Sequence, residues 1–160
     1  MEVTVLRRLA ALGLVSGREP VKSLPKACHA GRLRGGLSVS LRATPDELMG
    51  PLTTALGGSA RLLKVLDVRT GAPMLVEIEW RDVHEKWELA DLEALVHNLN
   101  DLFALEPGVA AAVVLGEWED MLQLWCVPKS ALLRLLDEGF LAEARNLPML
   151  QRLGGVTECS

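Results

Sequence analysis

The chain has 160 residues, a length typical of one domain with a substantial buried core. Hydrophobic residues make up 49% of the chain and aromatic residues only 4%, so we expect that core to be aliphatic. The formal net charge is −4. The three cysteines show no CxxC spacing, which argues against a disulfide framework and favours the reducing cytoplasm. No apolar run approaches the length of a membrane span, which argues against a membrane protein.

The charge is divided unevenly along the chain. Residues 1–36 carry seven basic and two acidic side chains, whereas the remainder carries ten basic and nineteen acidic ones. An acidic body repels phosphates, so we expect no nucleic-acid binding by the main domain and favour a protein partner, one with a basic surface. The basic segment 1–36 is interpreted as a helix or strand that docks on the body, with a linker. The alternative is an organelle-targeting leader.

Two elements are predicted at the start of the body. Residues 36–42 alternate apolar and small polar side chains, which indicates a half-buried strand. Thr44 then offers an N-cap, Pro45 suits the first helical position and acidic residues occupy the first turn. We therefore expect a helix from residue 45 to about Leu56.

A hairpin is predicted next, with strands at 61–69 and 74–81 around the turn at Thr70–Pro73. The simplest register places Arg69 opposite Met74. This register would put Asp67 on the core face, with Val65 and Ile78, and would leave Glu77 and Glu79 on the opposite face.

The second half of the chain predicts a helix followed by a second hairpin. Apolar residues at helical spacing indicate a helix from Trp87 to Ala104. Residues 109–115 are apolar at every position, which predicts a strand in the middle of the sheet. A return strand at 121–127 follows, then helices at 129–138 and 140–146, and we expect residues 154–160 to be frayed.

This order predicts an α+β fold, with helices packed on a single mixed or antiparallel sheet of about five strands. The domain would span residues 37–153. A ferredoxin-like arrangement is one form of this fold. The run DVRTGAPMLVEIEW, followed by a long helix and two strands, also resembles the element order of profilin-like and roadblock modules. The roadblock resemblance implies a small dimerising regulator without catalytic residues.

One group of acidic residues suggests an enzymatic alternative. Asp67 on one strand and Glu77 and Glu79 on the next have the layout of PD-(D/E)xK nucleases, which hold a divalent cation between acidic side chains. The third motif position is Glu79 in place of lysine, and the register above keeps Asp67 away from the two glutamates. A bulge that shifted the pairing by one residue would bring them together.

A second group of residues suggests a protein interface. Glu117, Glu119 and Asp120 surround Trp118 in a tight turn, and Trp87 lies near the predicted helix start. Exposed tryptophans often anchor partners, and an acidic turn can meet a basic partner surface.

No motif for a cofactor or a bound metal is present, and the sequence contains no phosphate-binding glycine loop. We therefore expect a non-enzymatic protein–protein interaction module, of an adaptor, regulatory, chaperone-like or immunity type, able to form a homodimer. The metal-dependent nuclease is the alternative.

Overall fold

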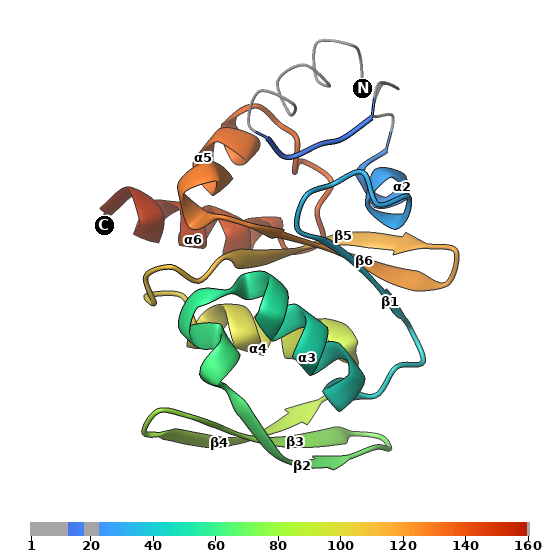
Figure 1. Ribbon diagram of the computed structural model, residues 1–160, viewed down its shortest axis with the longest axis vertical. Helices are drawn as coiled ribbons and strands as arrows, with labels where there is room; N and C mark the ends of the chain where they lie inside the picture. Colours follow the sequence, from blue (N-terminus) through green and yellow to red (C-terminus); the bar gives the residue numbers. More distant parts are fainter. Residues whose placement is uncertain (1–12, 18–22, 160) are drawn as a thin grey trace.

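The computed structural model describes residues 13–17 and 23–159, which form an α+β fold in four layers (Figure 1). A layer of helices covers one sheet, two helices lie between that sheet and a second one, and the second sheet closes the other side. In chain order the elements are α2 (Leu24–His29), β1 (Gly36–Ser40), α3 (Pro45–Leu56), the 3-10 helix η1 (Gly58–Leu62), β2 (Lys64–Arg69), β3 (Met74–Trp80), β4 (Val83–Leu89), α4 (Leu92–Leu102), β5 (Ala111–Trp118), β6 (Met121–Val127), α5 (Lys129–Asp137) and α6 (Leu147–Cys159).

The strands form two antiparallel sheets of three strands each, with the orders β1-β6-β5 and β2-β3-β4. The α+β class is confirmed, but the expected single sheet of about five strands is wrong. The two predicted hairpins do not pair with each other, because α3 and α4 lie between them (Figure 1). The main core fills this space, with side chains from both sheets and both helices.

The second sheet contains a strand that the periodicity of the sequence hides. The helix expected from Trp87 begins only at Leu92, because residues 83–89 form β4. Leu89 fits the helical spacing of the apolar residues that follow it. Trp87 and Leu89 also alternate with exposed polar residues, and the segment forms a strand because β3 offers a pairing edge. Asp91 instead caps α4 through a 2.9 Å hydrogen bond from the amide of Ala94.

The first sheet confirms the strands predicted around residues 36–42, 109–115 and 121–127, but their order differs. β6 is the central strand and β5 lies at an edge. β5 is nevertheless buried on both faces, because the main core covers Ala112 and Val114 and a second core covers Val113 and Leu115. A strand that is apolar at every position therefore indicates cover on both faces and does not fix its place in the sheet.

The second core lies between this sheet and the layer of α2, α5 and α6 (Figure 1). Fully buried Trp125 is at its centre, and its indole nitrogen donates to the carbonyl of Arg34 at 2.9 Å. The helix expected at residues 140–146 is a series of turns, and α6 starts at Leu147 with Pro148 in its first turn, a position that tolerates proline.

Several described residues of the basic segment 1–36 belong to this second core. Leu14, Leu24 and Leu33 are buried in the core, and Val15 pairs with Leu33 in an isolated bridge. The predicted leader lies largely outside the described residues, so targeting stays a prediction. Within the described part of the chain, none of the helices has the length and hydrophobicity needed to cross a membrane.

Candidate functional site

The free edge of β2 carries the most concentrated exposed apolar surface among the described residues. Leu62, Val65 and Leu66 are 62%, 37% and 47% exposed, and they follow one another along η1 and β2. β2 pairs with β3 on one side only, so its other backbone edge has no strand partner among residues 13–17 and 23–159. An edge strand with exposed apolar side chains is a template for pairing with another strand.

A β-bulge in this strand corrects the expected register. The pairing shifts between Val65 and Asp67, so Asp67 lies opposite Glu77 and Arg69 lies opposite Leu75. The bulge at the extra residue, Leu66, is explained by which side chain it places in the core. Without the bulge the carboxylate of Asp67 would point into an apolar core, whereas with the bulge Val68 takes that place, opposite buried Val76.

The bulge places the three carboxylates of the nuclease hypothesis on one sheet face. Asp67 is opposite Glu77, and Glu79 follows two positions later on the same face of β3. Glu77 contacts the imidazole of His84, and Asp67 forms an ion pair with Arg69 at 3.4 Å. No group of three or more acidic, histidine or cysteine side chains is arranged to hold a metal ion anywhere in residues 13–17 or 23–159.

The proposed tryptophan and acidic interface residues separate in space. Trp87 belongs to the main core, where its indole nitrogen donates to Glu85 at 2.6 Å. Trp118 is half-buried at the tip of the β5–β6 hairpin, with the ammonium of Lys26 5.9 Å from its ring centre.

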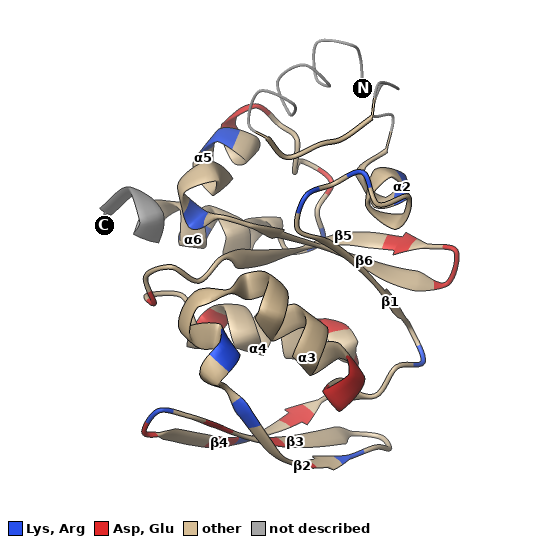
Figure 2. Ribbon diagram, viewed as in Figure 1, with Lys and Arg blue, Asp and Glu red and all other residues tan. Residues whose placement is uncertain are grey.

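The acidic residues of the same hairpin lie at the turn between β5 and β6, coloured red in Figure 2, and their side chains are exposed. Glu117 is 3.2 Å from Arg145, so part of its charge is already balanced within the chain. Glu119 and Asp120 occupy left-handed backbone positions, with φ of 54° and 58°, which is typical of a tight hairpin turn. Their role as an interface stays a prediction.

A large open cleft lies at the other end of the β1-β6-β5 sheet. Its volume is about 1430 Å³. Its walls come from the end of α3, the loop between α4 and β5, the start of α5 and one side of α6. The apolar wall contains Ala55, Leu56, Val109 and Ala110, while Leu105 in the same loop is 81% exposed.

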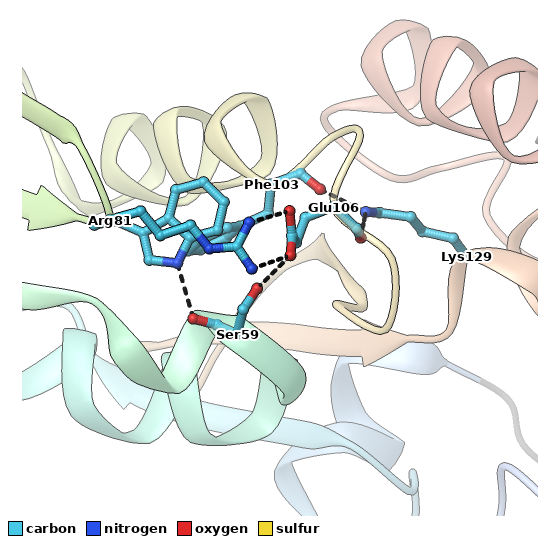
Figure 3. Close-up of polar contacts among 6 residues, drawn as sticks. Ser59, Arg81, Phe103, Glu106 and Lys129 are labelled. Atoms are coloured by element: carbon cyan, nitrogen blue, oxygen red, sulfur yellow. Dashed lines mark hydrogen bonds and ion pairs between the residues drawn. The ribbon is translucent and has the colours of Figure 1, made fainter.

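Glu106 holds the loop that forms one wall of this cleft (Figure 3). Its carboxylate receives two hydrogen bonds from Arg81, of 2.7 and 3.0 Å, and one of 2.9 Å from the hydroxyl of Ser59. Arg81 also stacks over the ring of Trp80, with its guanidinium carbon 4.7 Å from the ring centre. The indole nitrogen of Trp80 in turn donates to the carbonyl of Ser59 at 2.9 Å. The loop is thus fastened to η1 and to the β3–β4 turn.

Lys129 fastens the same loop from the opposite side. Its ammonium donates to the carbonyls of Phe103 and Glu106, at 2.5 and 3.0 Å (Figure 3). Burial lowers the pKa of Lys129 from its usual value, and the nearby carboxylate of Glu106 opposes this change. The pKa of Glu106 is itself lowered, first by the hydrogen bond from Ser59 and further by Arg81, against the effect of its desolvation.

Two further cations line the cleft. Arg34, just before β1, and Arg152, on α6, are both exposed there. Neither guanidinium takes part in an ion pair with another described residue, whereas Arg81 and Arg145 both do. These residues come from segments more than 100 positions apart, so no local motif of the sequence could have indicated the cleft.

Two free cysteines are buried on either side of the first sheet. Cys28 lies in the second core, where its thiol donates to the carbonyl of Leu124 at 3.3 Å, and Cys126 lies in the main core. Burial raises the pKa of both thiols, that of Cys126 to about 12. These two cysteines are therefore unreactive packing residues in the folded protein.

Comparisons with models of known families, with curated protein sequences and with solved structures find no match to this chain.

Proposed function

We propose that this protein is a non-enzymatic interaction module that binds another protein strand along the free edge of β2, and that a second copy of the chain is one such partner. The observation that carries the proposal is the row of exposed apolar side chains at Leu62, Val65 and Leu66 on an unpaired edge. Edge strands that are protected against pairing with another chain usually carry charged side chains, including some that point inward. In β2 the residues that face α3 and α4 are apolar instead.

The charges of β2 are compatible with self-association. The bulge leaves Lys64 and Asp67 on the same outer face, opposite Glu79 and Glu77 respectively. Two antiparallel copies can therefore pair Lys64 of each with Asp67 of the other, and Leu63 with Val68, so that the apolar residues share one face. Moving one strand along by two residues would instead bring Lys64 against Arg69, which is unfavourable.

A charge exchange tests this arrangement. We expect Lys64→Asp and Asp67→Lys to weaken the dimer when each is made alone, because each puts like charges opposite one another. The double variant should restore the dimer, because both pairs are then reversed together. Light scattering coupled to size-exclusion chromatography measures the mass. A wild type that remains monomeric at every concentration would rule out a second copy as the partner.

Apolar contact is tested separately with a matched pair of variants. Leu66→Asp should weaken association at the β2 edge by removing apolar contact and adding an unpaired charge. Leu41→Asp is the control, because Leu41 is 40% exposed but lies beyond β1, in the other sheet's layer. Equal effects of the two variants would argue against the β2 edge.

The nuclease remains the second candidate, because the bulge brings Asp67 opposite Glu77. The three carboxylates lie on a sheet face, and the large cleft is lined by other residues. We expect no cleavage of DNA or RNA with Mg²⁺ or Mn²⁺. Metal-dependent cleavage that is lost in Asp67→Ala and kept in Asp46→Ala would establish the nuclease and overturn the interaction module.

A further inference from the structure

The cleft at the end of the β1-β6-β5 sheet combines an apolar wall with positive charge. Ala55, Leu56, Val109 and Ala110 supply the wall. Arg34 and Arg152 supply two guanidinium groups that form no ion pair with another described residue, and the ammonium of Lys129 adds a third positive charge, although it donates to two backbone carbonyls. The carboxylate of Glu106, the acidic residue that lines it, is bound to Arg81 and Ser59 and so does not neutralise the arginines. An occupant must therefore be apolar on one side and acidic on another.

The start of α5 reinforces the positive character of the cleft. The helix begins at Lys129 with no side-chain cap and no acidic residue in its first turn. Backbone amides at such a helix start favour a negative group. The positive charge of the cleft contrasts with the chain as a whole, which has a net charge of −4. A cleft lined by positive charge attracts groups of opposite charge and raises their local concentration.

Size indicates the class of the occupant. Small-molecule pockets usually measure about 300–1,000 Å³ and enclose most of their ligand. This cleft has a volume of about 1430 Å³, and the neighbouring Leu105 is almost fully exposed. None of the described residues that line it is aromatic, so they offer no stacking surface of the kind with which proteins hold nucleic-acid bases.

We infer that the cleft binds a peptide segment of a partner protein, amphipathic and acidic, with its apolar side chains against Leu56 and Val109 and its carboxylates near Arg34 and Arg152. The clamped loop supports this assignment. Arg81, Ser59 and Lys129 hold residues 103–106 in place, so the wall is formed before any partner arrives and little ordering opposes binding. This inference does not depend on the β2 edge, which lies on the other sheet.

Three synthetic peptides of equal length test the inference. They share the same leucines at helical spacing and carry Glu, Gln or Lys at the remaining positions. Fluorescence anisotropy with the full chain measures their dissociation constants. We expect the Glu peptide to bind about tenfold or more tightly than the Gln peptide, and the Lys peptide to bind most weakly, as charge complementarity requires.

Variants of the protein locate the site. Arg34→Gln with Arg152→Gln should weaken binding of the Glu peptide by about tenfold and leave the Gln peptide almost unchanged. Arg42→Gln with Lys86→Gln is the matched control, because it removes two exposed cations that do not line the cleft. Far-ultraviolet circular dichroism confirms that both double variants fold.

Several results would overturn the inference. Equal affinities for the three peptides would remove the acidic requirement, and equal losses in the cleft and control variants would remove the site. Sodium dodecanoate is a further competitor, because it carries an apolar chain and a carboxylate but no peptide. If dodecanoate binds the cleft and displaces the Glu peptide at lower concentration than the peptide itself needs, the occupant is a lipid-like acid and the peptide assignment is wrong.

Discussion

Glu106 connects three parts of the chain that are distant in sequence. Its carboxylate receives hydrogen bonds from Ser59 in η1 and from Arg81 in the β3–β4 turn, while its backbone carbonyl receives one from Lys129 in α5. The bidentate pair with Arg81 has the planar geometry in which guanidinium and carboxylate groups interact best. Together with the hydrogen bonds from Lys129, this side chain holds the loop that forms one wall of the cleft.

This contact predicts a specific dependence of stability on pH. The pKa of Glu106 lies below its usual value in the folded protein, so protonation favours the unfolded chain. The stabilisation is therefore complete above the unfolded-state pKa near 4.5 and is lost as pH falls through the lower folded-state value. Denaturant unfolding of wild type and Glu106→Gln between pH 7 and pH 3 measures it.

We expect Glu106→Gln to be less stable than wild type at pH 7 and the two curves to converge at acidic pH. Glu119→Gln is the control, because Glu119 is an exposed glutamate in the β5–β6 turn. A constant difference between wild type and Glu106→Gln across the whole pH range would show that the carboxylate charge does not stabilise the loop.

At the scale of elements, the bulge in β2 decides which side chains face the core. Regular alternation from Lys64 would bury Asp67, and the additional residue Leu66 returns the sequence to the correct phase. The same residue also adds exposed apolar surface to the strand edge. The bulge therefore has two consequences, one for the core and one for the edge.

Deletion variants test this interpretation. Deleting Leu66 should convert β2 into a regular strand with Asp67 still outside and Val68 still inside, so we expect the free energy of unfolding to change by only about 1 kcal/mol. Deleting Val68 should instead bring Arg69 to the position opposite Val76 and destabilise the protein by about 3 kcal/mol or more. Urea denaturation measures both, and equal losses would contradict the assigned register.

Capping residues and prolines in the sequence predict where helices and strands begin and end, because their effects depend only on neighbouring residues. Thr44 and Pro45 correctly mark the start of α3, where a capping box with Glu47 forms, and Pro128 correctly ends β6. β4 could not be found in this way, because Leu89 continues the helical spacing of the apolar residues after it and also fits a strand pattern with Trp87. Only the presence of β3 as a pairing edge, a tertiary contact, decides between the two.

The candidate sites were less accessible to sequence reasoning than the fold. The sequence shows that Asp67 and Glu77 can lie opposite each other only if a bulge interrupts β2. Whether the bulge forms depends on the burial of Val68, which the sequence alone does not show. The cleft is lined by residues of α3, α5 and α6 that the fold brings to one place, and nothing in the sequence separates Arg34 and Arg152 from the other arginines. Long-range packing, which periodicity does not encode, determines both features.

At the scale of the whole molecule, the β1-β6-β5 sheet belongs to both cores. Leu124 of β6 packs in the main core, and its neighbour Trp125 packs in the second. If α2, α5 and α6 detached from one face of the sheet, residues of β6 on that face would become exposed. The same strand also contributes to the main core on the other face. The two cores should therefore unfold together, as in most single domains of this size.

Tryptophan variants test this cooperativity. One variant keeps only Trp125, and another keeps only Trp80, with phenylalanine at the other tryptophan positions. Within each variant we expect the fluorescence transition in urea to coincide with the transition in far-ultraviolet circular dichroism. A fluorescence transition of the Trp125 variant at lower urea than its circular dichroism transition would mean that the layer of α2, α5 and α6 detaches first.

The two buried thiols offer an internal reporter of such openings. Cys28 and Cys126 lie on the two sides of the same sheet, and alkylating reagents attack only the thiolate form, which burial suppresses. In a Cys159→Ser variant at pH 8, iodoacetamide should leave the folded chain unmodified and label both sites rapidly in urea. Mass spectrometry of partly labelled protein would then measure the rate at which each cysteine becomes accessible. Faster labelling of Cys28 than of Cys126 would indicate local unfolding of the layer of α2, α5 and α6 alone.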